Sequence, residues 1–345
     1  MMKLLVSRQT YYWLPALLLC LLAAVACENK KVDTAPVTGG SPEITRLSAL
    51  LKDNPNNDSL YYQRSVAFWE LEAYDEAIND ATRAISIDSL KPGYYQLLAD
   101  VLIDYRRPND SKRAIEVMKK ACYSFPDDLP TWLRLSEIYL IVRQHGEALK
   151  TLDHVLQRDP QNAEAYFTTG RVALDMGDTT RCIKSLQKSV LLDADNKDAW
   201  IFLGRLYSNR GSALAIQYFD NALRLDSSDV EVQEFKAAHY KRLGKFDEAF
   251  KLYRAIIVEH PDFTNAFFDM GLIYLELDSL DKAWWNFDMS IKTDPLFVIG
   301  YHYRGVTSEA KGNLKAAIED YKQANKMSPN LPEPKAALER LNIPD

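Results

Sequence analysis

The chain is poor in the residues that most often carry catalysis or hold metals. Its 345 residues include only five histidines and four cysteines, and the histidines are scattered without the spacing of a metal site. No His-Glu-x-x-His motif, phosphate-cradling glycine loop or nucleophile elbow occurs. The acidic residues are spread along the chain, some in adjacent pairs such as Asp75-Glu76, and surface carboxylates rarely do chemistry without a pocket. We therefore expect no enzyme activity, no metal site and no cofactor.

A stripe of basic residues is also missing. Lysine and arginine number 42 against 48 aspartates and glutamates, which gives a formal net charge of −6. Binding to nucleic acid depends on clustered cations that neutralise phosphates. We therefore expect no nucleic-acid partner.

No stretch alternates between apolar and polar residues as a half-buried strand does, and a period of 34 residues runs through most of the chain instead. Small residues recur at about this interval, at Ser65, Ala99, Ser136, Gly170, Gly204, Ala237, Gly271 and Gly305. A second small residue follows most of them twelve positions later, and other apolar residues fall at helical i, i+3, i+4 spacing. Such a period predicts a stack of helix pairs. The eight units begin at Asp58, Pro92, Leu129, Ala163, Lys197, Val230, Thr264 and Val298.

Further positions recur when each unit is numbered from 1 to 34. Position 4 is aromatic in seven units, with Gln233 as the exception, and we expect these side chains to cover the small residues at positions 8 and 20. Position 32 is proline in five units, and proline there cannot continue the second helix. The combination resembles the tetratricopeptide repeat family, and the eighth unit carries it most fully, with Tyr301, Gly305, Ala317, Tyr321, Ala324 and Pro329.

The resemblance implies an all-α fold, a right-handed superhelical solenoid of about eight helix-turn-helix repeats. The repeats would occupy residues 58–331, with capping helices in 44–57 and 332–345 that hide the terminal apolar faces from water. In this frame Cys122 and Cys182 fall at positions where other units hold small or aliphatic residues. We expect both to be buried, and to lie too far apart for a disulfide.

The N-terminus has the features of a secretory signal. Lys3 and Arg8 precede an apolar run of 14 residues that is too short for a comfortable membrane span. The small residues before Cys27 resemble a bacterial lipobox, which implies cleavage after residue 26 and acylation of Cys27. An ordinary secretory signal with an incidental cysteine is the alternative. Residues 27–43 are rich in Gly, Pro, Ser and Thr in their second half and predict a flexible tether.

The resemblance to a lipobox also predicts the location of the protein. Glu28 is not the aspartate associated with inner-membrane retention, and the following residues lack a strong acidic cluster of the kind linked to surface export. We therefore expect a lipoprotein of the bacterial cell envelope, held in the outer membrane by its N-terminal lipid and facing the periplasm.

In this family the first helices of the repeats line a concave groove that binds partner proteins. The resemblance places eleven side chains there: Tyr62, Trp69, Asp100, Leu133, Glu137, Leu140, Phe167, Arg171, Leu174, Arg205 and Phe268. Apolar residues flanked by arginines suit a peptide segment or helix with apolar anchors. Two alternatives remain open. The leucines could pack between first helices, and Arg171 or Arg205 could form a solvated ion pair with Asp175 or Glu137.

A second candidate contact lies on the convex face. Position 22 is polar in seven units, whereas the seventh unit has Trp285. A tryptophan there suggests a contact with a partner or with a second copy, although single exposed aromatic residues are also normal.

Two functions fit these features. The first is a membrane-anchored scaffold that gathers partner proteins in the bacterial envelope and supports assembly of an envelope complex. The second is a ligand-binding lipoprotein that captures a glycan or envelope fragment through the groove aromatics Tyr62, Trp69, Phe167 and Phe268. The second function requires these rings to meet in one cleft.

Overall fold

A computed structural model describes residues 41–342, and these residues form eighteen α-helices and no strand. The first helices of the eight pairs are α2 (Asp58–Glu70), α4 (Pro92–Tyr105), α6 (Leu129–Ile141), α8 (Ala163–Asp175), α10 (Lys197–Asn209), α12 (Val230–Arg242), α14 (Thr264–Glu276) and α16 (Val298–Ala310). The second helices are α3 (Tyr74–Ile87), α5 (Asp110–Ser124), α7 (His145–Arg158), α9 (Thr179–Leu192), α11 (Leu214–Leu225), α13 (Phe246–Glu259), α15 (Leu280–Thr293) and α17 (Leu314–Met327). The predicted all-α repeat fold is confirmed.

A further helix lies at each end of this series. Helix α1 (Pro42–Asp53) buries Ile44, Leu47 and Leu51 and packs against α2. Helix α18 (Pro332–Arg340) packs against α17, where Leu338 joins a cluster with Tyr321. Both helices cover apolar surface of a terminal repeat, as caps of a repeat stack do.

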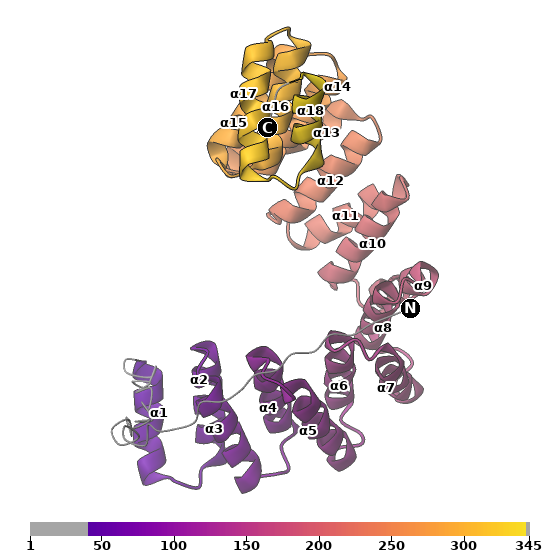
Figure 1. The fold of residues 1–345 in the computed structure, drawn as a ribbon. Helices are drawn as coiled ribbons and strands as arrows, with labels where there is room; N and C mark the ends of the chain where they lie inside the picture. The colour runs from indigo at the N-terminus through magenta and orange to yellow at the C-terminus, as the bar shows by residue number, and fades with distance from the viewer. Residues whose placement is uncertain (1–40, 343–345) are drawn as a thin grey trace, which may run out of the picture. The chain divides into compact units, whose positions relative to one another are not determined.

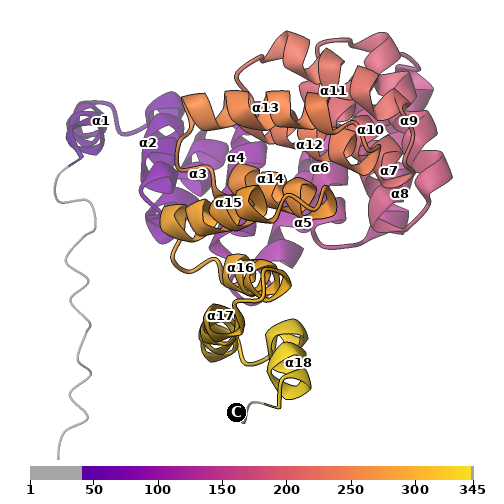
Figure 2. The same ribbon diagram turned by 90° about the horizontal axis from the view of Figure 1, so that it is seen from above.

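The chain divides into two compact units, one ending at Tyr105 and the other beginning at Arg106. Within each unit, consecutive helices run antiparallel and pack in chain order (Figures 1 and 2). The division falls inside the second repeat, between α4 and α5, in the turn whose extra residues lengthen this repeat beyond the period.

Capping side chains fix where most first helices begin. Asn57, Asn162 and Asn196 each precede a first helix, and each side-chain oxygen accepts a hydrogen bond from the backbone N–H three residues later, at 2.9 to 3.1 Å. Asp128 and Asp229 do the same at 3.1 Å. These bonds satisfy N–H groups that have no partner inside the helix.

The turn inside each repeat places position 15 in the left-handed backbone region. Four of the eight residues are glycine, and the other four carry side chains at φ of 53 to 58°: Glu72, Arg106, Arg143 and Asp278. Glycine adopts this conformation without a steric cost. The recurring turn therefore explains glycines that lie outside the helix-packing positions.

Position 4 has a role that the sequence did not predict. In six of the eight units its side chain donates a hydrogen bond to the backbone carbonyl six residues earlier, in the turn that enters the repeat. Trp200 Nε1, for example, lies 2.8 Å from the Ala194 oxygen. Gln233 makes the same bond to Ser227 O at 2.8 Å, so it preserves the interaction although it lacks a ring.

The small residues at position 8 are covered from the second helix of the same pair. A Cβ atom on Gly204 would lie 2.5 Å from Phe219 Cε1, and one on Gly271 would lie 2.6 Å from Phe287 Cε1. Both phenylalanines are fully buried. At the four glycines of position 8, the nearest side chains therefore come from position 23 or 24 of the second helix, and not from the aromatic residue at position 4 as predicted.

The two cysteines in the repeats are buried, as their positions predicted. Burial raises the pKa of the Cys122 thiol to about 12 and that of Cys182 to about 11. Both therefore stay protonated and inert at neutral pH, because the thiolate is the reactive form.

A buried histidine ties two neighbouring repeats together. His239 on α12 is fully buried; its Nδ1 lies 3.0 Å from Ser208 Oγ on α10, and its Nε2 lies 3.0 Å from the Ser212 carbonyl. Because a carbonyl only accepts, Nε2 carries the proton and Nδ1 accepts from the serine. Burial lowers the pKa of His239 below its usual range, and the nearby Arg242 adds to this effect. Burial also lowers the pKa of His302 below its usual range.

We expect the second unit to lose stability as the pH falls below about 6.5, the ordinary histidine pKa. Below that pH the unfolded chain binds protons that folded His239 and His302 do not, so protonation favours unfolding. Thermal midpoints at pH 7.5 and 5.5 should differ, and His239→Gln should reduce the difference. Equal midpoints for the unmodified protein at the two pH values would contradict this account.

Candidate binding surfaces

Three of the predicted groove residues meet in one hollow on the second unit. Leu140 on α6 and Arg171 and Leu174 on α8 line a cavity of about 450 Å³. The remaining lining residues are Ile141, Arg143, Asp175 and Phe202. The lining thus comes from first helices of three consecutive repeats and from one intra-repeat turn, which is the arrangement that the groove prediction requires.

The apolar part of this hollow is accessible to a partner. Leu174 is 37% exposed and Ile141 is 52% exposed. Leu133, by contrast, is 5% exposed, so its side chain packs in the interior and leaves little surface for a partner. Of the two alternatives for the leucines, core packing holds for Leu133 and groove lining for Leu140 and Leu174.

The charged residues of the hollow are only partly neutralised. Arg171 Nη1 lies 4.0 Å from Glu137 Oε1, at the limit of an ion pair, whereas Glu137 is engaged by Arg134 at 2.6 Å. Asp175 pairs with His145 at 2.5 Å. The Arg171 guanidinium therefore has only a distant carboxylate partner in Glu137. Exposed ion pairs of this kind contribute little to stability, so a partner can replace the pair at small cost.

The other predicted groove residues of the second unit pack locally. Phe167 lies edge-on to Phe202, with ring centroids 6.0 Å apart. Arg205 is exposed, and its guanidinium lies 5.1 Å from the Phe235 centroid. Phe268 is half-buried among three further rings, Phe287, Phe297 and Tyr303.

The predicted groove residues of the first unit also have local partners. Tyr62 stacks on Tyr94 at 5.1 Å, and Trp69 Nε1 donates to Asp104 Oδ2 at 2.9 Å. Asp100 is half-buried on α4. The four aromatic residues that could bind a glycan therefore pack against separate local neighbours and belong to two different units.

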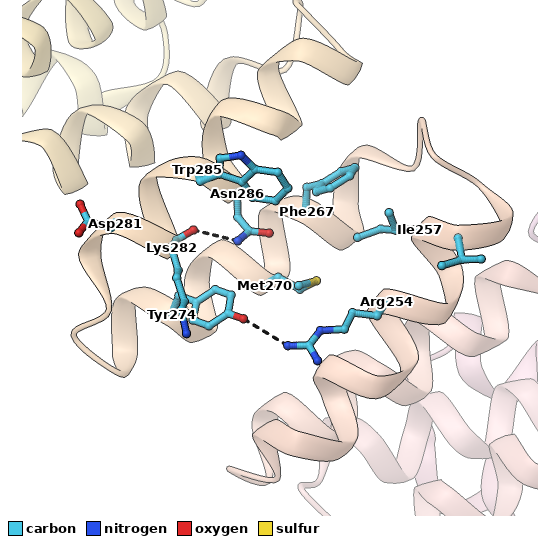
Figure 3. Close-up of a pocket in the computed structure, with 10 residues that line it drawn as sticks. Arg254, Ile257, Phe267, Met270, Tyr274, Asp281, Lys282, Trp285 and Asn286 are labelled. Carbon is cyan, nitrogen blue, oxygen red and sulfur yellow. Dashed lines mark hydrogen bonds between the residues drawn. The ribbon is translucent and has the colours of Figure 1, made fainter.

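Trp285, the predicted convex-face contact, borders a pocket of about 610 Å³ (Figure 3). The tryptophan is 51% exposed and meets Phe267 edge-on, with ring centroids 6.2 Å apart. Helices α13, α14 and α15 supply the lining residues Arg254, Ile257, Val258, Phe267, Met270, Tyr274, Asp281, Lys282, Trp285 and Asn286. Sequence reasoning identified only Trp285 among them as a contact residue, and it assigned Phe267, at position 4, to packing within the repeat.

The predicted signal peptide, Cys27 and most of the predicted tether lie outside the described residues. Within residues 41–342, no helix combines the length and apolar character required to span a bilayer. The same residues contain no group of three or more His, Cys, Asp or Glu side chains arranged to hold a metal ion.

Stacked helix pairs with an accessible lining on their first helices define a helical-repeat binding scaffold. Sequence models described as tetratricopeptide repeat match residues 140–206, residues 205–262, and residues 58–89 with 300–331, together more than half of the chain. The chain belongs to the tetratricopeptide repeat family. Proteins of this family mediate protein–protein interactions, and their fold is generally a scaffold rather than a catalyst.

Curated relatives are similar at low identity. Tetratricopeptide repeat protein 37 of Xenopus laevis is 22% identical over 75% of this chain and 20% of that protein. The DnaJ homolog subfamily C member 7 homolog of Schizosaccharomyces pombe is 23% identical over 80% of this chain and 65% of that protein. Hsp70-Hsp90 organizing protein 3 of Arabidopsis thaliana is 21% identical over 65% and 41%. This chain thus spans less than two thirds of the length of each.

Solved structures show the same fold. The C-terminal part of a repeat protein from Cytophaga hutchinsonii has a TM-score of 0.57 at 17% identity, covering 70% of this chain and 99% of that one. A tetratricopeptide repeat protein from Parabacteroides merdae has a TM-score of 0.51 at 20% identity, covering 71% and 97%. PilW, a type IV pilus biogenesis factor, has a TM-score of 0.51 at 19% identity, covering 61% and 99%.

Proposed function

We propose that this protein is a membrane-anchored scaffold of the bacterial cell envelope that holds partner proteins through its groove and supports assembly of an envelope complex. The hollow lined by Leu140, Arg171 and Leu174 carries the proposal. It offers exposed apolar surface beside an arginine whose ion pairing is weak. A partner segment with apolar anchors and an acidic residue is complementary to it.

The membrane part of the proposal rests on the sequence alone. Acylation of Cys27 would attach the chain to a bilayer, because each buried methylene contributes about 0.8 kcal/mol and several acyl chains anchor a protein stably. The residues from Cys27 to the start of α1 would then act as a tether for the repeats. Placement in the outer membrane, facing the periplasm, belongs to the same proposal.

Glycan capture is the less favoured function. A sugar site needs aromatic rings gathered on one cleft, whereas Tyr62 stacks on Tyr94 and Phe268 is half-buried among other rings. The hollow itself contains one aromatic side chain, Phe202.

Photo-crosslinking in living cells tests the scaffold function. A photoreactive amino acid at Ile141, which is exposed in the hollow, should give a discrete adduct with an envelope protein. Leu174→Glu should reduce the adduct about tenfold or more, because it places a charge against the apolar part of the partner. With Cys27→Ser, the same adduct should leave the membrane fraction.

Leu191 provides the matched control. It is 76% exposed on α9, and it is absent from the lining of the hollow. Neither the photoreactive group at Leu191 nor Leu191→Glu should affect the adduct. Indistinguishable adducts from Ile141 and Leu191, or adducts that survive Leu174→Glu unchanged, would count against the groove.

A further inference from the structure

The pocket beside Trp285 is amphipathic (Figure 3). Phe267 and Met270 on α14 form an apolar floor, and Ile257 and Val258 on α13 extend it towards solvent. Val258 is 80% exposed, and Trp285 is half-exposed at a position where the other seven repeats have polar residues. Large apolar side chains that cluster around an open pocket are typical of contact sites.

A buried hydrogen-bond acceptor in this pocket has no partner. Asn286 is 2% exposed, and its Nδ2 donates to the Lys282 carbonyl at 2.8 Å. Because a carbonyl only accepts, this bond fixes the orientation of the amide. Among the residues that the structure describes, no donor reaches Asn286 Oδ1. Figure 3 shows the amide projecting from α15 towards the space beside Phe267 and Met270.

An unpaired buried acceptor is costly, and native structures normally satisfy it. The Asn286 oxygen is shielded from bulk solvent, so a group that enters the pocket is best placed to reach it. That group must carry an N–H or O–H donor, and an otherwise apolar group suits the pocket because Phe267 and Met270 also line it.

Two cations border the same pocket without a carboxylate partner. Arg254 Nη2 lies 3.4 Å from the Tyr274 hydroxyl, and Lys282 Nζ lies 5.4 Å from the Tyr274 ring centroid. The nearby carboxylate, Asp281, is engaged by Lys311 at 2.6 Å. In residues 41–342, no acidic side chain comes within ion-pair distance of Arg254 or Lys282. The cationic border therefore complements an acidic partner.

We propose that this pocket binds an acidic segment of a partner protein that inserts one tyrosine or tryptophan side chain. The ring packs on Phe267 and Met270, and its O–H or N–H donates to Asn286 Oδ1. Carboxylates next to the inserted residue pair with Arg254 and Lys282. This surface is separate from the groove hollow, shares no lining residue with it, and is tested independently of the proposed function.

Peptide display on the purified full-length protein tests the proposal. Random twelve-residue peptides are selected on the unmodified protein, and binders to Trp285→Ala are discarded. The remaining peptides should contain tyrosine or tryptophan beside aspartate or glutamate. One enriched peptide is then synthesised, and its Kd is measured by calorimetry. Failure to enrich any peptide, or enrichment of aliphatic or basic sequences, overturns the proposal.

A double-mutant cycle tests the hydrogen bond to Asn286. Replacing the peptide tyrosine by phenylalanine, or its tryptophan by naphthylalanine, should weaken binding to the unmodified protein about tenfold. Binding to Asn286→Leu should already be about tenfold weaker and should not fall further with the altered peptide. Asn286→Leu should keep its thermal midpoint, because it also removes the unpaired acceptor. If the peptide change weakened binding to Asn286→Leu as much as it weakens binding to the unmodified protein, the assigned hydrogen bond would be contradicted.

Charge reversal tests the cationic border. Arg254→Glu and Lys282→Glu should each weaken the peptide at least tenfold, whereas Lys251→Glu, on the exposed face of α13 outside the pocket, should change the Kd less than twofold. If Lys251→Glu weakened peptide binding as much as Arg254→Glu and Lys282→Glu do, the effect would come from the net charge of the protein. That result would contradict specific pairing with Arg254 and Lys282. Displacement of the peptide by dodecanoate, or a protein dimer that Trp285→Ala abolishes, would identify a fatty acid or a second copy as the occupant and overturn the proposal.

Discussion

Arg304→Met is expected to lower the free energy of unfolding by about 3 kcal/mol or more. The Arg304 guanidinium makes two bonds to Asp320, at 2.6 and 3.0 Å, and one to Asp288 at 2.6 Å. Both carboxylates are buried, and burial raises the pKa of Asp320 although Arg304 opposes this effect. Methionine would leave two buried acids close together without the cation that lies between them. Chemical denaturation followed by circular dichroism measures the loss.

Arg340 is the matched control for this substitution. It pairs with Glu309 through the same two-pronged geometry, at 2.5 and 2.7 Å, but its side chain is exposed. Water screens exposed ion pairs and solvates the partner that remains, so Arg340→Met should have a much smaller effect. If both substitutions cost the same, burial is not what makes the Arg304 site sensitive.

Gly204→Val is expected to destabilise the second unit by about 2–3 kcal/mol. The new Cβ would lie 2.5 Å from the ring of Phe219, and that ring is fully buried and cannot swing outward. Valine and glycine differ little in helix propensity, so overpacking between α10 and α11 dominates the result. Urea denaturation of the unmodified and variant proteins measures the difference.

Two further variants separate overpacking from a general effect of losing a glycine. Gly146 lies in α7, and nothing comes within 4 Å of its Cβ position, so Gly146→Val should be nearly neutral. Phe219→Leu combined with Gly204→Val should recover part of the loss, because the smaller side chain makes room. If the losses of stability caused by Gly204→Val and Phe219→Leu were strictly additive, a clash between residue 204 and the ring of Phe219 would not be the cause.

Most of the fold could be predicted from the sequence because the same packing positions recur in each repeat. The first residue of each unit, such as Asp58 or Thr264, is also the first residue of a helix in the structure. The roles of single positions were harder to predict. A recurring tryptophan or tyrosine at position 4 suggests packing, whereas its hydrogen bond depends on a carbonyl in a turn. The residue type at position 4 does not reveal the direction of that carbonyl group.

The binding surfaces could be predicted only in part, for a related reason. Family positions led to Leu140, Arg171 and Leu174, which do line one hollow. Burial of Leu133 was not predictable, since helical spacing alone cannot separate a groove residue from one that packs between helices. Asn286 was beyond the reach of sequence reasoning, because an unpaired oxygen is a property of its surroundings in three dimensions.

The bond made by Gln233 bears on how such repeats are detected and designed. Search profiles that score position 4 for aromatic character penalise a unit that satisfies the backbone equally well with an amide. A profile that instead rewards any side chain long enough to donate to the preceding turn would recover divergent repeats. A designer could likewise place glutamine there to reduce the aromatic surface of a synthetic array while retaining the link between successive repeats.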